Sequence, residues 1–279
     1  MGQCRVIQLL GIMGLSLLVT LTVGCQKPQE GLTVVGSTSV QPFAEVLAEE
    51  YMVQHRQEKI YVQGGGSSAG IQAVQTGAAQ IGMASRSLAS SESALIGIPI
   101  AYDAIAVIVH PTNPIGDLSI EQIRKIFSGK VSRWNELGGK NHEITLVSRE
   151  EGSGTREAFQ HLLMGKAEVS LAALVQDSNG AIRQVVSDDP MAIGYISLGL
   201  VNKRVKALRI GGGEPTIENI KSHRYILVRP FLFVFKREPV SMEKIFLDFV
   251  LSPGGQKLLT REGLISVSSV SALQKGSQR

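Results

Sequence analysis

The chain repeats one order of apolar and polar positions: a short apolar run, a turn rich in glycine and hydroxyl residues, and a segment with apolar positions at helical spacing. LTVVGSTSVQPF from residue 32 and KIYVQGGGSSAG from residue 59 begin in this order, and the second helical segment ends at Gly77. ITLVSREEGSGTREAFQHLLMG, which ends at Gly165, follows the order again. Strands that alternate with helices in this way predict an α/β fold with mainly parallel strands.

The remaining segments continue the alternation and add two long apolar runs. The run at 98–111 is long enough to cross a domain, and the run at 225–236 contains Pro230, which suits a strand that changes direction or passes between domains. Two such connections suggest a chain that leaves one domain and later returns to it. The pattern also predicts helices at 119–129, 167–176, 180–189, 216–222 and 241–252, and strands at 79–86, 192–198 and 205–210.

Composition excludes several classes of function. The 279 residues are 43% hydrophobic, which is enough for a full core in one large domain or two smaller ones. The formal net charge is +4, aromatic residues make up 5%, and no block of five Lys or Arg residues occurs, so a nucleic-acid partner is not expected. No His or Cys pair has the spacing of metal ligands, and we predict neither a metal nor a cofactor.

Residues 1–25 have the pattern of a secretory signal, with Arg5 near the start, an uncharged apolar run and small residues before Cys25. The Gly-Cys ending resembles a lipoprotein signal, in which Cys25 carries the lipid (palmitate) and becomes the mature N-terminus. A plain secretory signal and a retained membrane anchor are the alternatives. We expect an exported protein, lipid-anchored at the cell membrane or periplasmic, with residues 26–31 as a short tether.

The unit from residue 144 has the chemistry of an anion site. The first N–H groups of a helix lack intrahelical partners and lie at the positive end of its dipole, so Ser153, Gly154 and Thr155 can offer amides and hydroxyls to one anion. Arg149, on the same loop, can hold two oxygens of a tetrahedral oxyanion. Glu151 repels an anion unless the ligand carries a proton or Arg149 neutralises it, which favours protonated phosphate over fully ionised sulfate.

Six segments together resemble, in order, the phosphate-binding proteins of bacterial Pst-type phosphate importers: GSTSV, GGGSSAG, IGMASR, SREEGSGT, SNGAIRQVVSDDPMAIGYISLGLV and FLDFVLSPGGQKLL. The resemblance covers about Leu32 to Val267. It implies a type II periplasmic-binding-protein fold, with two α/β lobes joined by two crossing segments near Ile108 and Leu227 and a ligand cleft between them. Lobe one is then 32–108 with 227–279, and lobe two is 109–226.

The resemblance also implies the binding residues. The family's phosphate contacts fall on Thr38, Ser39, Ser68, Arg149, Ser153, Gly154 and Thr155. Glu151 is expected to be an acceptor for a phosphate hydroxyl or a partner for Arg149. Some members have an aspartate where this chain has Arg86, which either contacts the anion or pairs with an acidic neighbour. Further possible contacts are Ser37, Ser67 and Ser85, together with Arg86.

We therefore expect a monomeric, non-enzymatic binding protein that captures inorganic phosphate and delivers it to the membrane permease subunits of an ABC importer. The alternatives are the same fold tuned to sulfate or molybdate, and a phosphate sensor. An enzyme alternative rests on GSSAG at 66–70, which fits the G-x-S-x-G pattern with Ser68 as the nucleophile of a serine hydrolase. The five histidines are poorly placed to serve it, so this alternative ranks last.

Overall fold

The apolar run at 98–111 forms most of β4 (Ile96–Val109), a long strand in the computed structural model, which describes residues 31–222 and 224–269. The signal predicted at 1–25, its lipidation residue Cys25 and the tether as far as residue 30 lie outside the described residues, as does the end of the chain after residue 269. In the part that the structure describes, no helix has both the length and the hydropathy needed to cross a membrane.

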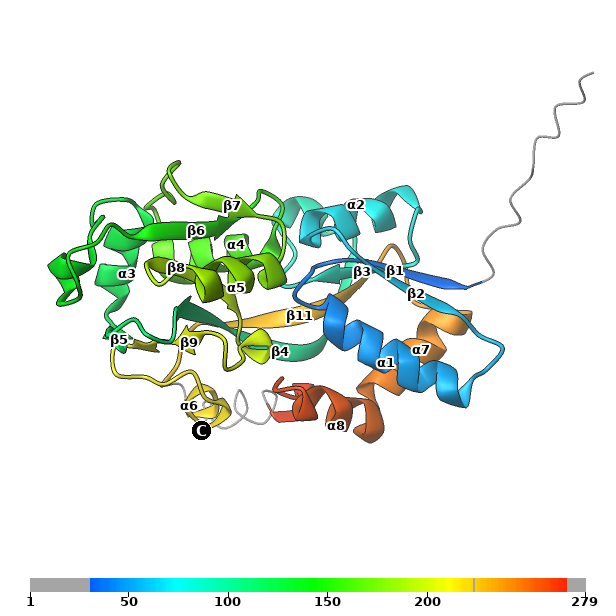
Figure 1. Cartoon of the computed structure of the whole chain (residues 1–279). Coiled ribbons are helices and arrows are strands. Elements are labelled where there is room, and N and C mark those ends of the chain that lie inside the picture. The colour runs from blue at the N-terminus through cyan, green and yellow to red at the C-terminus, as the bar shows by residue number, and fades with distance from the viewer. Residues whose placement is uncertain (1–30, 223, 270–279) are drawn as a thin grey trace, which may run out of the picture. The chain divides into compact units, whose positions relative to one another are not determined.

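The strands form one mixed sheet with β4 near its centre (Figure 1). Its strands are, in order, β2 (Ile60–Gly64), β1 (Leu32–Gly36), β3 (Ile81–Ala84), β11 (Val228–Phe235), β4, β8 (Ala192–Ser197), β6 (Thr145–Arg149) and β7 (Leu174–Gln176). β1 is parallel to both of its neighbours and so is β6, as the alternating pattern predicts. The pairings of β4 and β11 are antiparallel. The sheet is therefore parallel towards both ends and antiparallel where the two long strands cross.

Shorter strands complete the sheet structure. β9 (Lys206–Ala207) pairs with β4, and β5 (Asp117–Leu118) pairs with β10 (Arg209–Ile210) in a separate ladder. The strand predicted at 205–210 is therefore two short strands, because its two halves pair with different partners.

β4 changes its partner along its length. As far as Ala104 it pairs with β11, and from Ile105 it pairs with β8. Pro230 in β11 lies opposite Tyr102 of β4. A proline costs no ladder bond at this position, because the N–H and C=O of Tyr102 are both hydrogen-bonded to the backbone of Ile265, at 2.8 and 2.9 Å. Pro230 thus lies within a central strand of the sheet without loss of a ladder bond.

Two large clusters of buried apolar side chains lie on the two sides of this crossing. One contains Phe233 and Phe246 and is built largely on β1, β3 and β11. The other contains Phe159 and Tyr195, whose rings stack with centroids 3.9 Å apart. Separate cores imply separate folding layers, and β4 and β11 are the strands that connect them. The architecture is two α/β lobes joined by two crossing segments, as expected.

The helices follow the predicted pattern with one exception. The helix predicted at 119–129 begins with a capping box, since the Ser119 hydroxyl accepts from the Gln122 N–H at 3.1 Å and the Gln122 side chain accepts from the Ser119 N–H at 2.8 Å. The helices are α1 (Gln41–Gln54), α2 (Ser67–Thr76), α3 (Ile120–Phe127), α4 (Gly154–Phe159), α5 (Asn179–Asp188), α6 (Ile217–Lys221), α7 (Ser241–Leu251) and α8 (Pro253–Arg261).

The helix predicted at 167–176 is wrong. This segment contains turns and then β7, which pairs with β6. Leu171, Leu174 and Val175 are exposed, so their helical spacing does not mark a buried face. Backbone pairing with β6 decided the structure here, because an edge strand needs only one neighbour to satisfy its ladder.

Candidate anion-binding site

The loop after β1 and the first turn of α4 meet through hydroxyl groups. Ser39 Oγ lies 2.7 Å from Thr155 Oγ1, and both residues are at most 1% exposed. Arg149, the last residue of β6, donates from Nη2 to Thr38 Oγ1 at 3.1 Å. The structure therefore places these four predicted residues together, although the first and third hydroxyl-rich loops are more than a hundred residues apart along the chain.

The second hydroxyl-rich loop joins the same cluster at the start of α2. The Ser68 N–H donates to the Gly152 carbonyl at 3.1 Å. Gly154 packs so closely on this loop that a β-carbon at this position would overlap Ser67 Oγ and approach Ser85 Oγ to 2.7 Å. Glycine at residue 154 is thus a requirement of close approach between the two loops, in addition to any amide that it offers to a ligand.

Arg149 is held on one side and free on the other. Its Nε and Nη2 donate to the two carboxylate oxygens of Glu150, each at 2.8 Å, and to the carbonyls of Gln176 and Asp177 at 3.2 and 3.0 Å. The residue is 1% exposed, and Nη1 has no hydrogen-bond partner among the described residues. A buried guanidinium N–H is rarely left unpaired, so this nitrogen is a donor suited to a ligand.

The carboxylate partner of Arg149 is Glu150, and the prediction of Glu151 as that partner is wrong. Glu150 directly follows β6 and its side chain folds back along the guanidinium. Glu151 lies in the turn that follows and is exposed. Within this turn Glu150 faces Arg149 and Glu151 is exposed, and the alternative role of Glu151 as an acceptor for a phosphate hydroxyl stays a prediction.

Ser153 fixes the start of α4. It is the N-cap residue, and its hydroxyl accepts from the Arg156 N–H at 3.3 Å. The Arg156 side chain donates from Nη1 to the Arg149 carbonyl at 3.0 Å. These contacts connect the helix start to the end of β6, so the amides of the first turn and the guanidinium of Arg149 have a fixed relative position.

Ser37, Ser67 and Ser85 form a buried hydroxyl network around the ends of β1 and β3 and the start of α2. Ser37 Oγ donates to Ser85 Oγ at 2.9 Å, and the Ser85 N–H donates to Ser67 Oγ at 3.1 Å. All three residues are at most 2% exposed. They therefore position the β1 and β3 loops against α2, in contact with the predicted site residues.

Arg86 pairs with acidic neighbours, which is one of the two roles left open by the sequence. Its Nη1 and Nη2 donate to the two oxygens of Glu92 at 2.7 and 2.9 Å, and its Nε lies 2.5 Å from Glu157 Oε2. The hydrogen bonds from Arg86 hold the pKa of the Glu92 carboxyl below its ordinary value. Two carboxylates thus compensate the charge of this guanidinium.

Arg229, Asp103 and Asn179 belong to the same cluster and were missed by sequence reasoning. Arg229 on β11 donates to Asp103 Oδ2 from Nε and Nη2, at 3.1 and 2.9 Å, and is 2% exposed. It also donates to Thr155 Oγ1 at 2.8 Å and to Ser39 Oγ at 3.2 Å. Burial raises the pKa of the Asp103 carboxyl, while the charge and hydrogen bonds of Arg229 act in the opposite direction.

A signal for this pair was present in the two long apolar runs. Asp103 is the charged residue within IPIAYDAIAVIV, and Arg229 precedes Pro230 within YILVRPFLFVF. A charge inside an otherwise apolar strand is rarely buried without a partner. The two charges of opposite sign lie directly opposite each other in the register of β4 and β11.

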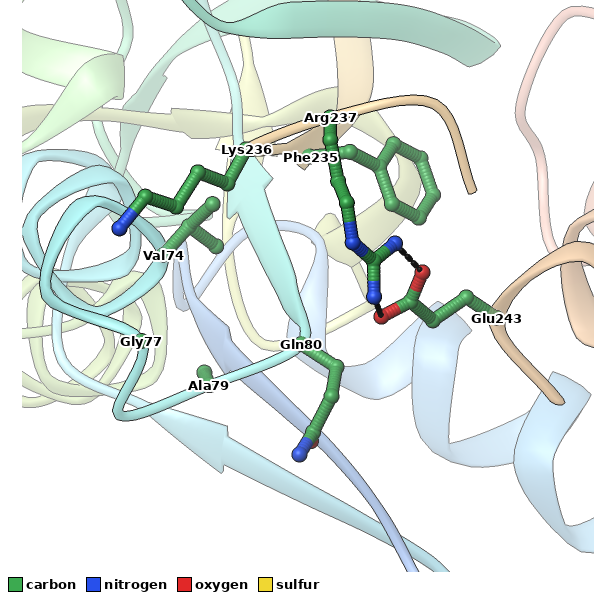
Figure 2. Close-up of a pocket in the computed structure, with 8 residues that line it drawn as sticks. All are labelled: Val74, Gly77, Ala79, Gln80, Phe235, Lys236, Arg237 and Glu243. Carbon is green, nitrogen blue, oxygen red and sulfur yellow. Dashed lines mark hydrogen bonds and ion pairs between the residues drawn. The ribbon is translucent and has the colours of Figure 1, made fainter. Parts of the chain in front are cut away.

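Figure 2 shows a pocket that is separate from this cluster. It is lined by residues around the end of α2 and the end of β11, and none of them is a predicted site residue. Within it, the Arg237 guanidinium donates hydrogen bonds to the two carboxylate oxygens of Glu243, at 2.7 and 3.2 Å (Figure 2). The charges of Arg237 and Glu243 in this pocket therefore compensate each other. A different pocket, next to the hydroxyl cluster, is lined by Arg86, Glu157 and Arg229.

The hydroxyl of Ser68 donates to Glu157 Oε1 at 3.4 Å. Among the described residues, no hydrogen bond connects Ser68 to a histidine, which is the base that the serine-hydrolase pattern requires. No group of three or more His, Cys, Asp or Glu residues suited to a metal ion occurs within the described ranges.

Comparisons with known proteins place the chain in a family. Residues 23–253 match the model of the PBP superfamily domain. The phosphate-binding protein PstS of Bacillus subtilis is 34% identical over 253 residues, which cover 88% of this chain and 84% of the relative. PstS of Borreliella burgdorferi is 28% identical over 259 residues, with 88% of this chain and 92% of the relative covered.

Solved structures agree with these relatives. A phosphate ABC transporter substrate-binding protein from Clostridium perfringens, solved with bound phosphate, has a TM-score of 0.83 and 42% identity over 85% of this chain and 99% of its own. An ABC-type phosphate transport receptor from Vibrio cholerae has a TM-score of 0.71 and 38% identity, covering 84% and 99%. On the fold, the clustered loops and these similarities, the chain belongs to the PstS family of substrate-binding proteins within the PBP superfamily.

Proposed function

We propose that this protein captures inorganic phosphate between its two lobes and delivers it to the permease subunits of an ABC importer. The observation that carries the proposal is the buried Arg149, whose Nη1 is unpaired among the described residues and which contacts the hydroxyl cluster through Thr38. A tetrahedral oxyanion complements one guanidinium donor, several hydroxyls and the amides of a helix start. The names of the PstS relatives and the phosphate in the Clostridium structure agree with this ligand.

The proposed site residues are Thr38, Ser39, Ser68, Arg149, Ser153, Gly154 and Thr155, with Ser39 acting through its hydrogen bond to Thr155. The proposed lobes are 32–108 with 227–279, and 109–226. The exchange of strand partners between Ala104 and Ile105 supports a boundary on β4 a few residues before the predicted one. In this arrangement Thr38, Ser39 and Ser68 come from lobe one and the others from lobe two, so an anion bound to both sets stabilises the closed lobes.

The proposed location is outside the cytoplasm, with the protein tethered to the cell membrane through a lipid on Cys25. The leader pattern and the Gly-Cys ending support this assignment. We propose that the protein acts as a monomer and binds its ligand without chemical turnover. Incorporation of labelled palmitate into the wild-type chain, and its loss in Cys25→Ser, is the expected result. Equal labelling of both chains would reject Cys25 as the lipid site.

Titration calorimetry tests the ligand. The purified chain, stripped of ligand by unfolding and refolding, is titrated with phosphate and with sulfate at neutral pH. We expect tight phosphate binding, no sulfate response, and loss of phosphate binding in Arg149→Ala and in Thr155→Ala. Equal binding of both anions would indicate a general oxyanion carrier, and no response to either anion would overturn the proposed function.

A further inference from the structure

Arg229 uses all of its hydrogen-bond donors within the protein. An arginine side chain has five N–H groups. Those of Arg229 are directed to the Asp103 carboxylate from Nε and Nη2, to the Ser85 carbonyl from Nη1 at 3.3 Å, and to the hydroxyl oxygens of Thr155 and Ser39. Arg229 therefore has no donor left for a ligand in this arrangement. Any hydrogen-bonding effect that it has on a bound anion must pass through the groups that it contacts.

The two hydrogen bonds that the Ser39 hydroxyl accepts determine that it donates its own proton. Its oxygen accepts from Arg229 Nη2 at 3.2 Å and from Asn179 Nδ2 at 2.8 Å. The orientation of the Asn179 amide is fixed, because its Oδ1 accepts from the Ser197 backbone N–H at 3.1 Å, and a backbone N–H only donates. Since both lone pairs of Ser39 Oγ are in use, its proton is donated, and the nearest acceptor is Thr155 Oγ1 at 2.7 Å.

The same accounting applies to Thr155. Its oxygen accepts from Arg229 Nη1 at 2.8 Å and from the Ser39 hydroxyl. Its own proton must therefore be donated to a further acceptor. Thr155 is the second residue of α4, in the first turn after the N-cap residue Ser153. This turn also carries the backbone N–H groups that lack partners within the helix. The chain of hydrogen bonds thus ends in a hydroxyl that can only donate.

The strands that contain Arg229 and Asp103 explain why the orientation of the two hydroxyls is fixed. Arg229 is on β11 and Asp103 is its directly opposite neighbour on β4, so the pair is mounted on the two strands that cross between the lobes. Both side chains are 1% exposed. Asp103 fixes the guanidinium, and the guanidinium contacts Ser39 in the β1 loop and Thr155 in α4 at the same time.

We propose that Arg229, fixed by Asp103, is a positioning residue that commits the hydroxyls of Ser39 and Thr155 to donating, so that the anion oxygen at Thr155 is an unprotonated acceptor. This inference rests on the proposed function and assigns to the site a preference for one ligand chemistry at one position. It also makes the crossing strands part of the binding site, since the order of the hydroxyl protons depends on a pair that lies on them.

A charge-neutral deletion tests the proposal. Arg229→Met with Asp103→Leu removes a cation and an anion together, so the long-range field at the ligand changes little, and exchange of a buried ion pair for apolar residues is often neutral for folding. We expect this double variant to fold, as checked by urea denaturation, and to bind phosphate about ten- to a hundredfold more weakly, because loss of an oriented hydrogen bond to a charged group costs roughly 1.5–3 kcal/mol.

Coupling to Thr155 separates positioning from a structural effect. The Thr155→Val variant lacks the hydroxyl through which Arg229 is proposed to act on the anion. Adding the Arg229→Met and Asp103→Leu pair there should weaken phosphate binding by no more than about threefold. Losses that multiply fully in the combined variant would overturn the proposal, because they would show that Arg229 acts independently of Thr155.

The control is an exposed arginine that follows the same strand and is also paired with a carboxylate. Arg237→Met with Glu243→Leu removes the pair of Figure 2 and should leave phosphate affinity unchanged. Arg229→Lys, which keeps the charge but not the fork, gives a second measurement with an expected loss of at least about tenfold. Wild-type affinity in Arg229→Lys contradicts the inference. If the wild-type chain binds phosphate through Arg149 and only the coupling fails, the proposed function stands without this inference.

Discussion

Arg149 and Arg229 are both buried arginines of the same cluster, and they differ in what their donors contact. Arg149 is paired with Glu150 on one edge and has Nη1 unpaired among the described residues. Arg229 is paired with Asp103 and directs its remaining donors to a carbonyl and two hydroxyls of the protein. In the proposed site the first arginine holds the anion directly, and the second organises the groups that do.

The comparison teaches that burial and charge do not by themselves identify a ligand contact. Both guanidiniums are at most 2% exposed, and both have a carboxylate within 3 Å. The count of donors already in use separates them. A donor count of this kind requires side-chain positions, and it gives each arginine a different expected response to substitution.

The largest expected effect is on phosphate binding by Arg149. Arg149→Ala should weaken it roughly a thousandfold, because an unpaired buried charge costs about 3–5 kcal/mol and each 1.4 kcal/mol is about a factor of ten. Calorimetric titration measures the loss. If Arg149→Ala weakened phosphate binding less than the Arg229→Met and Asp103→Leu double variant does, the roles assigned to the two arginines would be reversed.

The carboxylate partners should differ in their contributions to stability. Asp103→Ala leaves Arg229 buried and unpaired, and we expect the free energy of unfolding to fall by about 3–5 kcal/mol. Glu150 is 30% exposed, so Glu150→Ala leaves Arg149 closer to water and should cost clearly less. Urea denaturation of the two ligand-free variants measures both losses, and equal losses would contradict the difference in burial.

A third arginine, Arg86, gives a pH-dependent test. The pKa of Glu92 is lowered mainly by its hydrogen bonds from Arg86, so this carboxyl binds protons less readily in the folded chain. Its contribution to stability is present above the unfolded value of about 4.3 and is lost as pH falls through the lower folded pKa. Acid denaturation should therefore be less steep in Glu92→Gln between the unfolded pKa and the lower folded pKa of this carboxyl. Identical acid limbs in both chains would rule out the contribution.

The smallest effect is expected at Glu151. Because its side chain is exposed and Glu150 is the partner of Arg149, Glu151→Gln should change phosphate affinity by less than about twofold. Titration of Glu151→Gln and Glu150→Gln under the same conditions makes the comparison. A large loss confined to Glu151→Gln would restore the acceptor role predicted from the sequence.

The local part of the site was predictable because its chemistry is local. Gly36 to Ser39, Gly64 to Ser68 and Arg149 to Thr155 are short loops between a strand and a helix, and their residue types alone favour an anion. The choice between Glu150 and Glu151 was not predictable, since it depends on the direction of one turn. The prediction of a helix at 167–176 was wrong because this segment contains an exposed edge strand. The sequence of such a strand shows no regular alternation of buried and exposed positions.

Asp103 and Arg229 show what lies beyond local pattern. They are 126 positions apart, and each stands in an apolar run whose period indicates only that it is buried. Their contact requires β4 and β11 to be neighbours, antiparallel and in one register. Sequence by itself determined the strand, loop and helix units and the hydroxyl-rich turns, because hydrophobic period and turn chemistry act between near neighbours. Tertiary structure decided which charges meet and which donors remain free, because these depend on strand order and register across the whole chain.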